Sequence, residues 1–364
     1  MTPPLTVLLI GAGTRTRKLY APWLSGLLPY QGRPVRPLAV VDTDLDAART
    51  VAAALPGAVA ALPRDLDGLL SGHRPDLVVV ATPDDAHRDY VLQALAAGCT
   101  TLVEKPLANT RQDAFALARA ADVSPARLLV GHNLRFTNVH AHVRALLADG
   151  RIGTVTDADF HYTLNSSHAR SYFTRWHRAR AVSGGLEVTK ASHHLDLLTW
   201  WLGSQPVAVT GLLERRHYRP GHDNVPADAD IHDTLRALIQ YSSGTTVHYT
   251  LTSNAAAEGY ICTLYGTDGV LSIRYDARSG PHTLRLNTRS GDDRRLVGRE
   301  DGTHAGADLR MLHALPPALT SATGPFATAA EAALSVAAGT AMYDSSRCGR
   351  RLPIPQPAIS GGTR

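Results

Sequence analysis

Lysine is rare in this chain, which makes its lysines candidates for chemistry. Of the 37 lysine and arginine residues, only Lys18, Lys105 and Lys190 are lysines, so 34 are arginines. An ammonium group can lose its proton when its surroundings favour the neutral form, whereas a guanidinium group cannot. Lys105 and Lys190 are therefore predicted to take part in proton transfer or to hydrogen-bond a reacting oxygen.

Two histidines close to Lys190 extend this candidate group. Lys190, His193 and His194 are spaced i, i+3 and i+4 in a predicted helix over 189–202, so we expect them on one side of it. Imidazole has a reference pKa of about 6.5, which suits general acid–base catalysis near neutral pH. Asp196, three residues after His193, is expected to orient its ring. Ordinary helix capping or packing is the alternative, and adjacent histidines on a helix do not predict a metal site.

A glycine-rich turn near the N-terminus indicates nucleotide binding. Gly11-Ala12-Gly13-Thr14-Arg15-Thr16 follows an apolar strand and precedes a helical stretch. The first glycine permits a tight turn, and the second lets a pyrophosphate approach the backbone. Thr16 stands where a third glycine is usual. A glycine turn that binds no ligand is the alternative.

An acidic residue at the end of the next strand bears on which dinucleotide is bound. Asp42 follows Leu38-Ala39-Val40-Val41. A carboxylate there binds the ribose hydroxyls and repels a 2′-phosphate, so NAD is expected and NADP is the alternative. Arg15 and Arg17 favour the alternative, because an arginine near this turn could accept that phosphate.

The elements that must position these residues form two regions. Over residues 1–132, continuous apolar strands alternate with helical stretches, which predicts a doubly wound Rossmann domain with a parallel sheet. The predicted strands are Leu5–Ile10, Pro37–Val41, Leu77–Ala81, Thr101–Val103 and Leu128–Gly131. Ligands bind at the carboxyl ends of such strands, where Gly11, Asp42 and Lys105 lie.

Residues 133–364 are predicted to form an α+β domain with a mostly antiparallel sheet that has one open face. Its strands alternate polar and apolar residues, and helical stretches flank them. The predicted strands are 154–162, 207–213, 234–241, 245–253, 260–265 and 270–275. Apolar residues on both faces of 207–213 and 245–253 predict a homodimer or homotetramer through this sheet.

Composition excludes several classes of protein. With 364 residues, of which 44% are hydrophobic and 19% charged, the chain is neither disordered nor fibrous. No apolar run is long enough to cross a membrane. A net charge of +5 is too small and too scattered to predict a nucleic-acid surface. Three widely separated cysteines argue against a disulfide framework, so a cytoplasmic location is expected.

Four short motifs give the chain a resemblance to a known family. They are Ala81-Thr82-Pro83 with His87, Glu104-Lys105-Pro106, the run GHNLRF (131–136) and His193-His194-Leu195-Asp196. Together they resemble the Gfo/Idh/MocA oxidoreductases over residues 5–353. The segment 172–203 resembles a subgroup with a Lys-x-x-His-His run that acts on sugars and related polyols.

The resemblance implies an NAD(P)-dependent oxidoreductase that moves a hydride between nicotinamide and a carbinol carbon of a sugar, sugar derivative or cyclitol. It places Lys105 near the nicotinamide and the reacting oxygen. Many members pair this lysine with an Asp-x-x-x-His unit, but alignment on His193 puts Thr189 where that aspartate would be. Lys105, His193 and Lys190 are thus the expected catalytic residues.

Further contacts follow from the same motifs. The residues expected to bind the cofactor are Gly11, Gly13, Thr14, Arg15, Asp42, Thr82, Pro83, His87, Glu104, Lys105, Asn133 and Trp176, and those expected to bind substrate are Arg175, His177 and His194. A phosphorylated or nucleotide-linked substrate is left open.

Two other functions also stay open. One is a glycosidase or eliminase that retains NAD and works through a transient ketone. The other is a sensor of NAD or sugar without catalysis, against which the joint presence of Lys105 and His193 argues.

Overall fold

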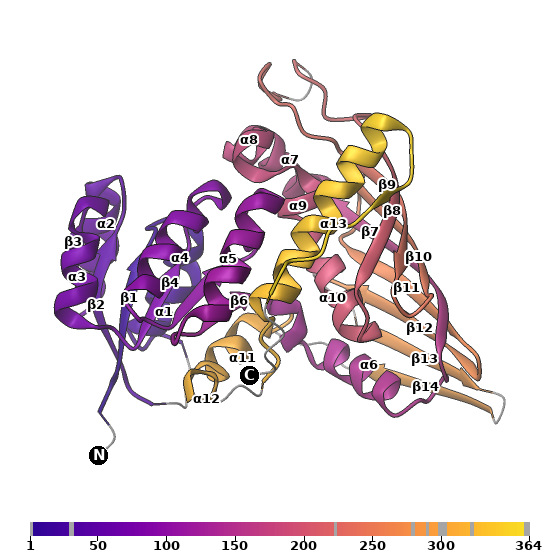
Figure 1. The fold of residues 1–364 in the computed structure, drawn as a ribbon, viewed down its shortest axis with the longest axis horizontal. Helices are drawn as coiled ribbons and strands as arrows, with labels where there is room; N and C mark the ends of the chain where they lie inside the picture. Colours follow the sequence, from indigo (N-terminus) through magenta and orange to yellow (C-terminus); the bar gives the residue numbers. More distant parts are fainter. Residues whose placement is uncertain are drawn as a thin grey trace.

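The computed structural model describes residues 3–28, 33–221, 224–277, 281–288, 291–297, 304–320 and 324–359, with the backbone alone for 292–297. The described chain forms two sheets with helices between and around them (Figure 1). The two sheets confirm the predicted fold class, a doubly wound parallel sheet followed by a mostly antiparallel one.

The first sheet has six strands in the order β3-β2-β1-β4-β5-β6, and every neighbouring pair is parallel. This is the strand order of a dinucleotide-binding domain. The strands are β1 (Leu5–Ile10), β2 (Val35–Val41), β3 (Val59–Ala61), β4 (Leu77–Val80), β5 (Thr101–Glu104) and β6 (Leu128–Gly131). The short strand β3 was not predicted, because three residues at the sheet edge carry too little apolar pattern.

Both faces of this sheet are buried. Along β1, Leu8 and Ile10 join the core on one face, while Val7 and Leu9 join the core on the other. Successive side chains of a strand point to opposite faces, so a strand buried on both sides is apolar throughout. The helices that cover it include α1 (Ala21–Leu24), α2 (Leu45–Ala52), α3 (Leu66–His73), α4 (His87–Ala96) and α5 (Arg111–Val123).

The second sheet has nine strands in the order β14-β13-β12-β11-β7-β10-β9-β8-β15. Its neighbours are antiparallel except for β7 and β10, which run parallel. The strands are β7 (Val155–Asn165), β8 (Pro206–Glu214), β9 (Thr234–Tyr241), β10 (Thr246–Ala255), β11 (Gly259–Gly266), β12 (Gly269–Asp276), β13 (His282–Thr288), β14 (Gly291–Val297) and β15 (Leu352–Pro353). The last three were not predicted.

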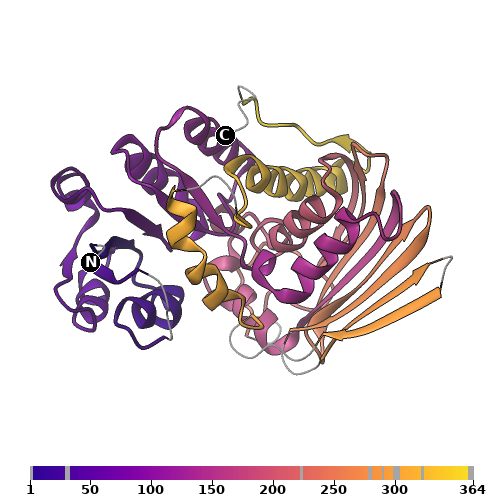
Figure 2. The ribbon, with the colours of Figure 1, turned by 90° about the horizontal axis from the view of Figure 1, so that it is seen from below.

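Helices cover only one face of the second sheet (Figure 2). They are α6 (Asn138–Ala148), α10 (Ser192–Leu202) and α13 (Ala329–Cys348). On the open face, Leu212, Leu238 and Ile261 are 52%, 46% and 53% exposed. The expectation that β10 carries apolar residues on both of its faces was wrong. Its apolar residues Val247 and Leu251 are both buried on the covered face.

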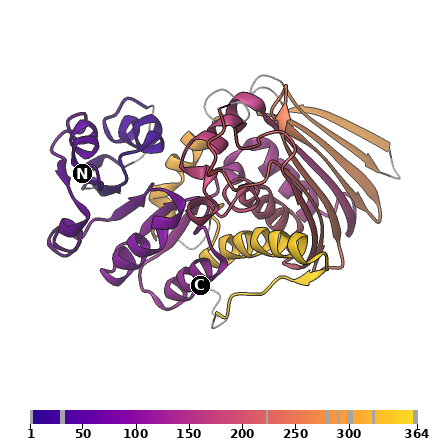
Figure 3. The same cartoon turned by 90° about the horizontal axis from the view of Figure 1, so that it is seen from above.

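The chain returns from the second sheet to the first near its C-terminal end. Helices α11 (Ala307–His313) and α12 (Leu315–Thr320) pack on the core of the first sheet through residues such as Met311 and Leu315. Figure 3 shows α13 running from the first sheet along the second. The predicted division into two domains at residue 132 stays a prediction. Helices near the C-terminal end of the chain contribute residues to the cores of both sheets.

The expected helix over 189–202 is interrupted. Helix α9 (Leu186–Thr189) ends just before Lys190, and α10 begins at Ser192. Helix α13 packs closely against α9, since a Cβ on Gly339 would lie 2.0 Å from the carbonyl oxygen of Glu187. Lys190 therefore lies between two helices instead of on the face of one. Within the described chain, no helix is long and apolar enough to span a membrane.

Candidate active site

A cleft of about 220 Å³ lies where the carboxyl ends of β4, β5 and β6 meet segments of the second region. These segments are α7 (Ser166–Thr174), the short helix Trp176–Arg178 and the turn between α9 and α10. The cleft is lined by Arg15, Ala81, Thr82, Asp84, Glu104, Lys105, Asn133, His168, Tyr172, Trp176, His177, Thr189, Lys190, His193 and His304. The structure thus brings all three expected catalytic residues to one cleft.

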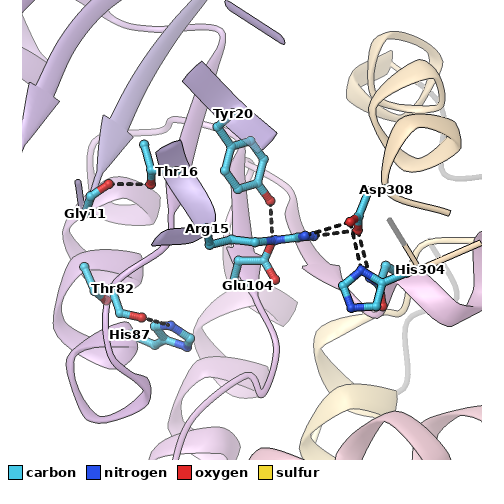
Figure 4. Close-up of polar contacts among 10 residues, drawn as sticks. Gly11, Arg15, Thr16, Tyr20, Thr82, His87, Glu104, His304 and Asp308 are labelled. Atoms are coloured by element: carbon cyan, nitrogen blue, oxygen red, sulfur yellow. Dashed lines mark hydrogen bonds and ion pairs between the residues drawn. The ribbon is translucent and has the colours of Figure 1, made fainter. Parts of the chain in front are cut away.

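The glycine-rich turn passes close to β4 and then opens outward. Gly11 has a φ of +101°, and a Cβ there would lie 2.5 Å from the carbonyl oxygen of Ala81, so only glycine fits. A Cβ on Gly13 would meet nothing within 4 Å. Thr16, the departure from the usual third glycine, is buried and donates from its hydroxyl to the Gly11 carbonyl at 2.5 Å (Figure 4). The closed turn beside open space fits a bound pyrophosphate.

Asp42 has a structural contact with this turn. One carboxylate oxygen accepts a hydrogen bond from the backbone N–H of Ala12 at 2.6 Å, and the other accepts one from Asp44 at 2.9 Å. Asp44, and not Asp42, caps the following helix by accepting from Asp46 and Ala47. Asp42 therefore fixes its carboxylate at the edge of the turn, where a ribose is expected.

Arg15 is held by two carboxylates from distant parts of the chain. Its Nε donates to Glu104 at 2.6 Å, and its two terminal nitrogens donate to Asp308 at 2.8 and 2.9 Å (Figure 4). The Tyr20 hydroxyl donates to the same Glu104 oxygen at 2.6 Å. Arg15 is thus engaged within the protein, which weakens the argument that it accepts a 2′-phosphate.

The carboxylate of Asp308, in the first turn of α11, is hydrogen-bonded by side chains from several parts of the chain. Besides Arg15, Asn133 donates to it at 2.8 Å, and the His304 ring lies 2.8 Å from it. Burial alone would raise the pKa of Asp308, but the His304 hydrogen bond and the Arg15 charge hold it well below its usual range. The carboxylate therefore stays charged and ties α11 to the nucleotide turn.

His87 lies beneath the cleft instead of lining it. One ring nitrogen is 2.8 Å from the carbonyl oxygen of Pro106. The other is 3.2 Å from the carbonyl oxygen of Thr82 (Figure 4). The ring is fully buried, and burial lowers its pKa. His87 thus joins the loops after β4 and β5. Its expected contact with the cofactor stays a prediction. The same holds for Thr14 and Pro83, which also lie outside the cleft lining.

Lys105 spans the cleft from the end of β5. Its Nζ donates to the carbonyl oxygen of Thr189 at 3.0 Å, so a residue of the first region contacts the turn that carries Lys190. Burial lowers the pKa of Lys105, whereas the Asp84 and Glu104 carboxylates oppose this. An ammonium group has three protons to donate, and only this one contact occupies it among the described residues.

Lys190 belongs to a charged cluster on the other side of the cleft. Its Nζ lies 3.7 Å from Glu258 and 4.8 Å from the centre of the Tyr162 ring. Glu258 also accepts hydrogen bonds from Tyr162 at 2.8 Å and from His168 at 2.9 Å. Burial lowers the pKa of Lys190 to about 8, although the charge of Glu258 opposes this.

His193 lines the cleft, but its partner differs from the expected one. Asp196 accepts two hydrogen bonds from Arg135 at 2.7 and 2.8 Å and does not bond His193. The Nδ1 of His193 is buried without a hydrogen-bond partner in the described structure. Burial, followed by the charges of Lys105 and Lys190, lowers its pKa well below its ordinary value. His193 is therefore neutral at pH 7, contrary to the reference pKa assumed for it.

The three residues expected to contact substrate do not all lie in the cleft. His177 lines the cleft with Trp176, and their rings stack with centroids 3.6 Å apart. His194 turns instead into the core of the second sheet, where its Nδ1 lies 2.8 Å from the Tyr249 hydroxyl. Arg175 is exposed and outside the lining. His194 points away from the cleft because it is next to His193 on α10, and adjacent residues of a helix face different ways.

Sequence reasoning missed several groups in and around the cleft. Asp84 follows Thr82-Pro83 at the end of β4, and an acidic residue at that position was a usable signal. Glu258 and Asp308 lie far along the chain from the residues they bond. No local pattern could have linked them. No group of three potential metal ligands is present among the described residues.

Two family models match the chain. The oxidoreductase family with an NAD-binding Rossmann fold matches residues 5–132, and the C-terminal alpha/beta domain of the same Gfo/Idh/MocA family matches residues 144–354. The two matches fall on the two sheets.

Individual proteins give consistent matches. A putative oxidoreductase, YteT, of Bacillus subtilis (strain 168) is 30% identical over 56% of this chain and 61% of its own length. An inositol 2-dehydrogenase of Rhizobium meliloti (strain 1021) is 30% identical over 65% of each chain. The chain thus spans slightly less than two thirds of these relatives. A levoglucosan dehydrogenase in complex with NADH and levoglucosan has a TM-score of 0.80 at 18% identity, over 97% of this chain and 100% of that one, which shows a shared fold.

Proposed function

We infer the reaction from the family and the cleft: the chain belongs to the Gfo/Idh/MocA oxidoreductases, whose N-terminal domain binds NAD. We propose that it moves a hydride between nicotinamide and a carbinol carbon of a sugar, sugar derivative or cyclitol. The observation that carries this proposal is the position of Lys105, which projects from the end of β5 into the cleft and contacts Thr189.

The cofactor is proposed to be NAD. The open space at Gly13 accommodates the pyrophosphate, and Asp42 holds the ribose hydroxyls. Arg15 is bonded to Glu104 and Asp308, and the exposed Arg17 donates to the Ala12 carbonyl at 2.9 Å. When bound, the nicotinamide supplies a hydride acceptor or donor.

Three residues of the cleft are proposed to bind and activate the substrate. Lys105 hydrogen-bonds the reacting oxygen, takes its proton during oxidation and, once charged, stabilises the developing alkoxide charge. His193, which is neutral at pH 7, accepts or donates a hydrogen bond on the same oxygen. Lys190, with a pKa of about 8, is mostly charged at pH 7 and binds a second substrate hydroxyl.

The substrate is proposed to be a small polyhydroxylated ring. The wall opposite the nucleotide turn combines aromatic rings, from Tyr172, Trp176 and His177, with the donors of Lys190 and His168. Rings offer apolar faces to the C–H surface of a sugar, and the donors match its hydroxyls. Inositol and levoglucosan, named for the matched dehydrogenases, are of this chemical class.

A substrate screen tests the function. Purified protein is mixed with NAD or NADP and with inositols, free and anhydro sugars, sugar phosphates or nucleotide sugars, and the absorbance of reduced nicotinamide is followed. Reduction that requires one of these compounds and is lost in Lys105→Ala supports the proposal. Reduction that persists in Lys105→Ala contradicts the role of the cleft.

The same screen separates the two alternatives. Conversion of a glycoside without net reduction of added NAD would identify the enzyme as redox-neutral. Binding of both NAD and a sugar, measured by calorimetry, without any product would identify a sensor.

A further inference from the structure

Asp84 is a buried carboxylic acid in the cleft that the proposed mechanism leaves unused. It follows Pro83 at the end of β4 and begins a short helix, Asp84–Ala86. Its residue is only 5% exposed, and it lines the cleft together with Lys105. Its Oδ2 has no hydrogen-bond partner in the described structure. A buried carboxyl oxygen without a partner is costly, so it calls for a functional explanation.

The carboxyl group of Asp84 and the amine of Lys105 influence each other. Burial raises the pKa of Asp84 to about 7, and the charge of Lys105 is the largest effect that opposes this. In turn, Asp84 is the largest of the charges that raise the pKa of Lys105. No direct ion pair joins them, and Thr189 stands beside both: its carbonyl accepts from Lys105, and its hydroxyl faces the Asp84 carboxyl group and favours its charged form.

We propose that Asp84 is a positioning residue that governs the charge of Lys105 and gives up its own proton to water when Lys105 takes one from the substrate. The inference rests on the proposed function. It gives this cleft an acidic group from the first region, close to Thr189, which occupies the position expected for an aspartate. Burial disfavours charge on both Asp84 and Lys105, so the two groups share one proton.

The proton balance can be written for alcohol oxidation. The C–H bond breaks and its electron pair leaves as hydride to nicotinamide, while the hydroxyl proton passes to the neutral amine of Lys105. The new ammonium charge lowers the pKa of Asp84, which releases its own proton to water. One hydride and one proton have left the alcohol, and the combined charge of the two side chains is unchanged.

Other ionisable groups face this pair and shape its titration. Arg15 and Glu104 act from the nucleotide turn and β5, and Asp85 lies next to Asp84 in sequence. His132 follows β6, and His177 and Tyr172 face the pair from the α7 segment. Lys190 and His193 act from the α9–α10 turn. These residues stay in place in every variant compared, so the comparison isolates the substitution at Asp84.

Lysine NMR provides a test that does not depend on turnover. With lysine labelled with ¹³C at Cε, the chain gives three signals, which Lys→Arg variants assign. Each signal is titrated in the wild type, in Asp84→Asn and in Asp85→Asn, the matched control at an exposed neighbour. We expect Asp84→Asn to lower the pKa of Lys105 by about one unit, the lower end of the effect of a nearby opposite charge. Asp85→Asn should leave the pKa of Lys105 unchanged.

Asp84→Glu guards against a simple structural effect, because it restores the carboxylate and should raise the pKa of Lys105 above that of Asp84→Asn. An unchanged Lys105 titration in Asp84→Asn, or an equal shift in Asp85→Asn, overturns the proposal. If Asp84→Asn does not fold, Asp84→Ala takes its place, and a Lys105 titration equal to that of the wild type in Asp84→Ala overturns the proposal.

Kinetics add a second readout once a substrate is known. The acidic limb of kcat/KM for oxidation reports protonation of the amine, so it should move to lower pH in Asp84→Asn by the same amount as the NMR titration. The affinity for NAD should not change. If no substrate is oxidised, the proposed function fails, while the NMR result still decides the coupling between Asp84 and Lys105.

Discussion

Two groups of residues in the cleft differ in how completely their polar atoms are paired. At the nucleotide turn, which we call the paired side, Arg15, Glu104 and Asp308 satisfy one another at 2.6–2.9 Å. Near Lys105, Asp84 at the end of β4 and His193 on α10 each have a buried polar atom without a partner in the described structure. Because such atoms are costly to bury, the paired side is organised in advance and the unpaired residues are poised for a ligand.

This contrast separates two kinds of residue in one site. The paired groups place the cofactor and should matter mainly for stability and binding. The unpaired groups face the reacting atoms and should matter mainly for turnover.

Substitution of Lys105 should have the largest effect. Lys105→Arg and Lys105→Ala are both expected to lower turnover by about 10²–10⁴-fold, the range for a lost acid–base group, because guanidinium cannot transfer the proton. Affinity for NAD should change far less. Steady-state kinetics and calorimetry measure the two quantities, and Lys18→Arg, at an exposed lysine, is the control. Turnover in Lys105→Arg above about half that of the wild type would show that the assignment is wrong.

On the paired side, Arg15→Met should cost stability. It leaves the Glu104 and Asp308 carboxylates without their cation, and breaking a buried ion pair costs about 3 kcal/mol. The low pKa of Asp308 stabilises the fold above its unfolded pKa of about 3.9, and this contribution is lost as the pH falls. Urea unfolding should therefore show a larger difference from the wild type at pH 7 than at about pH 2.5, below the unfolded pKa. A difference independent of pH would contradict this account.

Lys190→Met should lower kcat/KM by about 10–100-fold, the value of a hydrogen bond to a charged group. The ammonium form exists below its pKa of about 8, so wild-type kcat/KM should fall as the pH rises past this value. The variant should lack that basic limb. The measurement is a pH profile of both proteins, and a limb that survives in Lys190→Met would assign it to another group.

NAD should bind at least about tenfold more tightly than NADP, which corresponds to about 1.4 kcal/mol. Repulsion of a 2′-phosphate by Asp42 is the reason, and Asp42→Ser should remove most of the difference. Calorimetric titration with both cofactors measures it. Equal affinities in the wild type would indicate that Arg17 decides the preference.

The smallest effect concerns assembly through the open face of the second sheet. We expect a dimer or tetramer of the 38.9 kDa chain, which light scattering detects as a multiple of that mass. Leu238→Glu should dissociate it, whereas Leu27→Glu, at an exposed leucine of the first region, should not. A wild-type mass equal to one chain at micromolar concentration would rule this out.

The sequence predicted the architecture well because the apolar pattern of buried strands is local. The five strands expected in the first sheet are all present, and the glycine turn lies where it was expected. Lys105, Lys190 and His193 could be chosen from composition and motifs, and all three line the cleft.

What could not be predicted depends on contacts between distant parts of the chain. The partner of Arg15 lies 293 positions away at Asp308, and Asp196 turned out to bond Arg135 instead of His193. The expected lysine–histidine face failed because the helix is interrupted, with α9 ending at Thr189 and α10 beginning at Ser192, so that Lys190 lies between the two. The pKa of His193 lies below the reference value used in the sequence analysis. Burial lowers it, and burial depends on the fold and not on the spacing of residues.

Helix α13 has a consequence for how the molecule melts and moves. Its first turns are buried with the first sheet, through Ala332 and Val336, and its later turns with the second, through Ala341 and Met342. At 1.5 Å per residue, its 20 residues form a strut about 30 Å long that is common to both cores. Neither half can lose its packing without exposing part of the other, so heat should melt the chain in one cooperative step. The strut also fixes the span of the cleft, which confines any opening to a pivot about this helix.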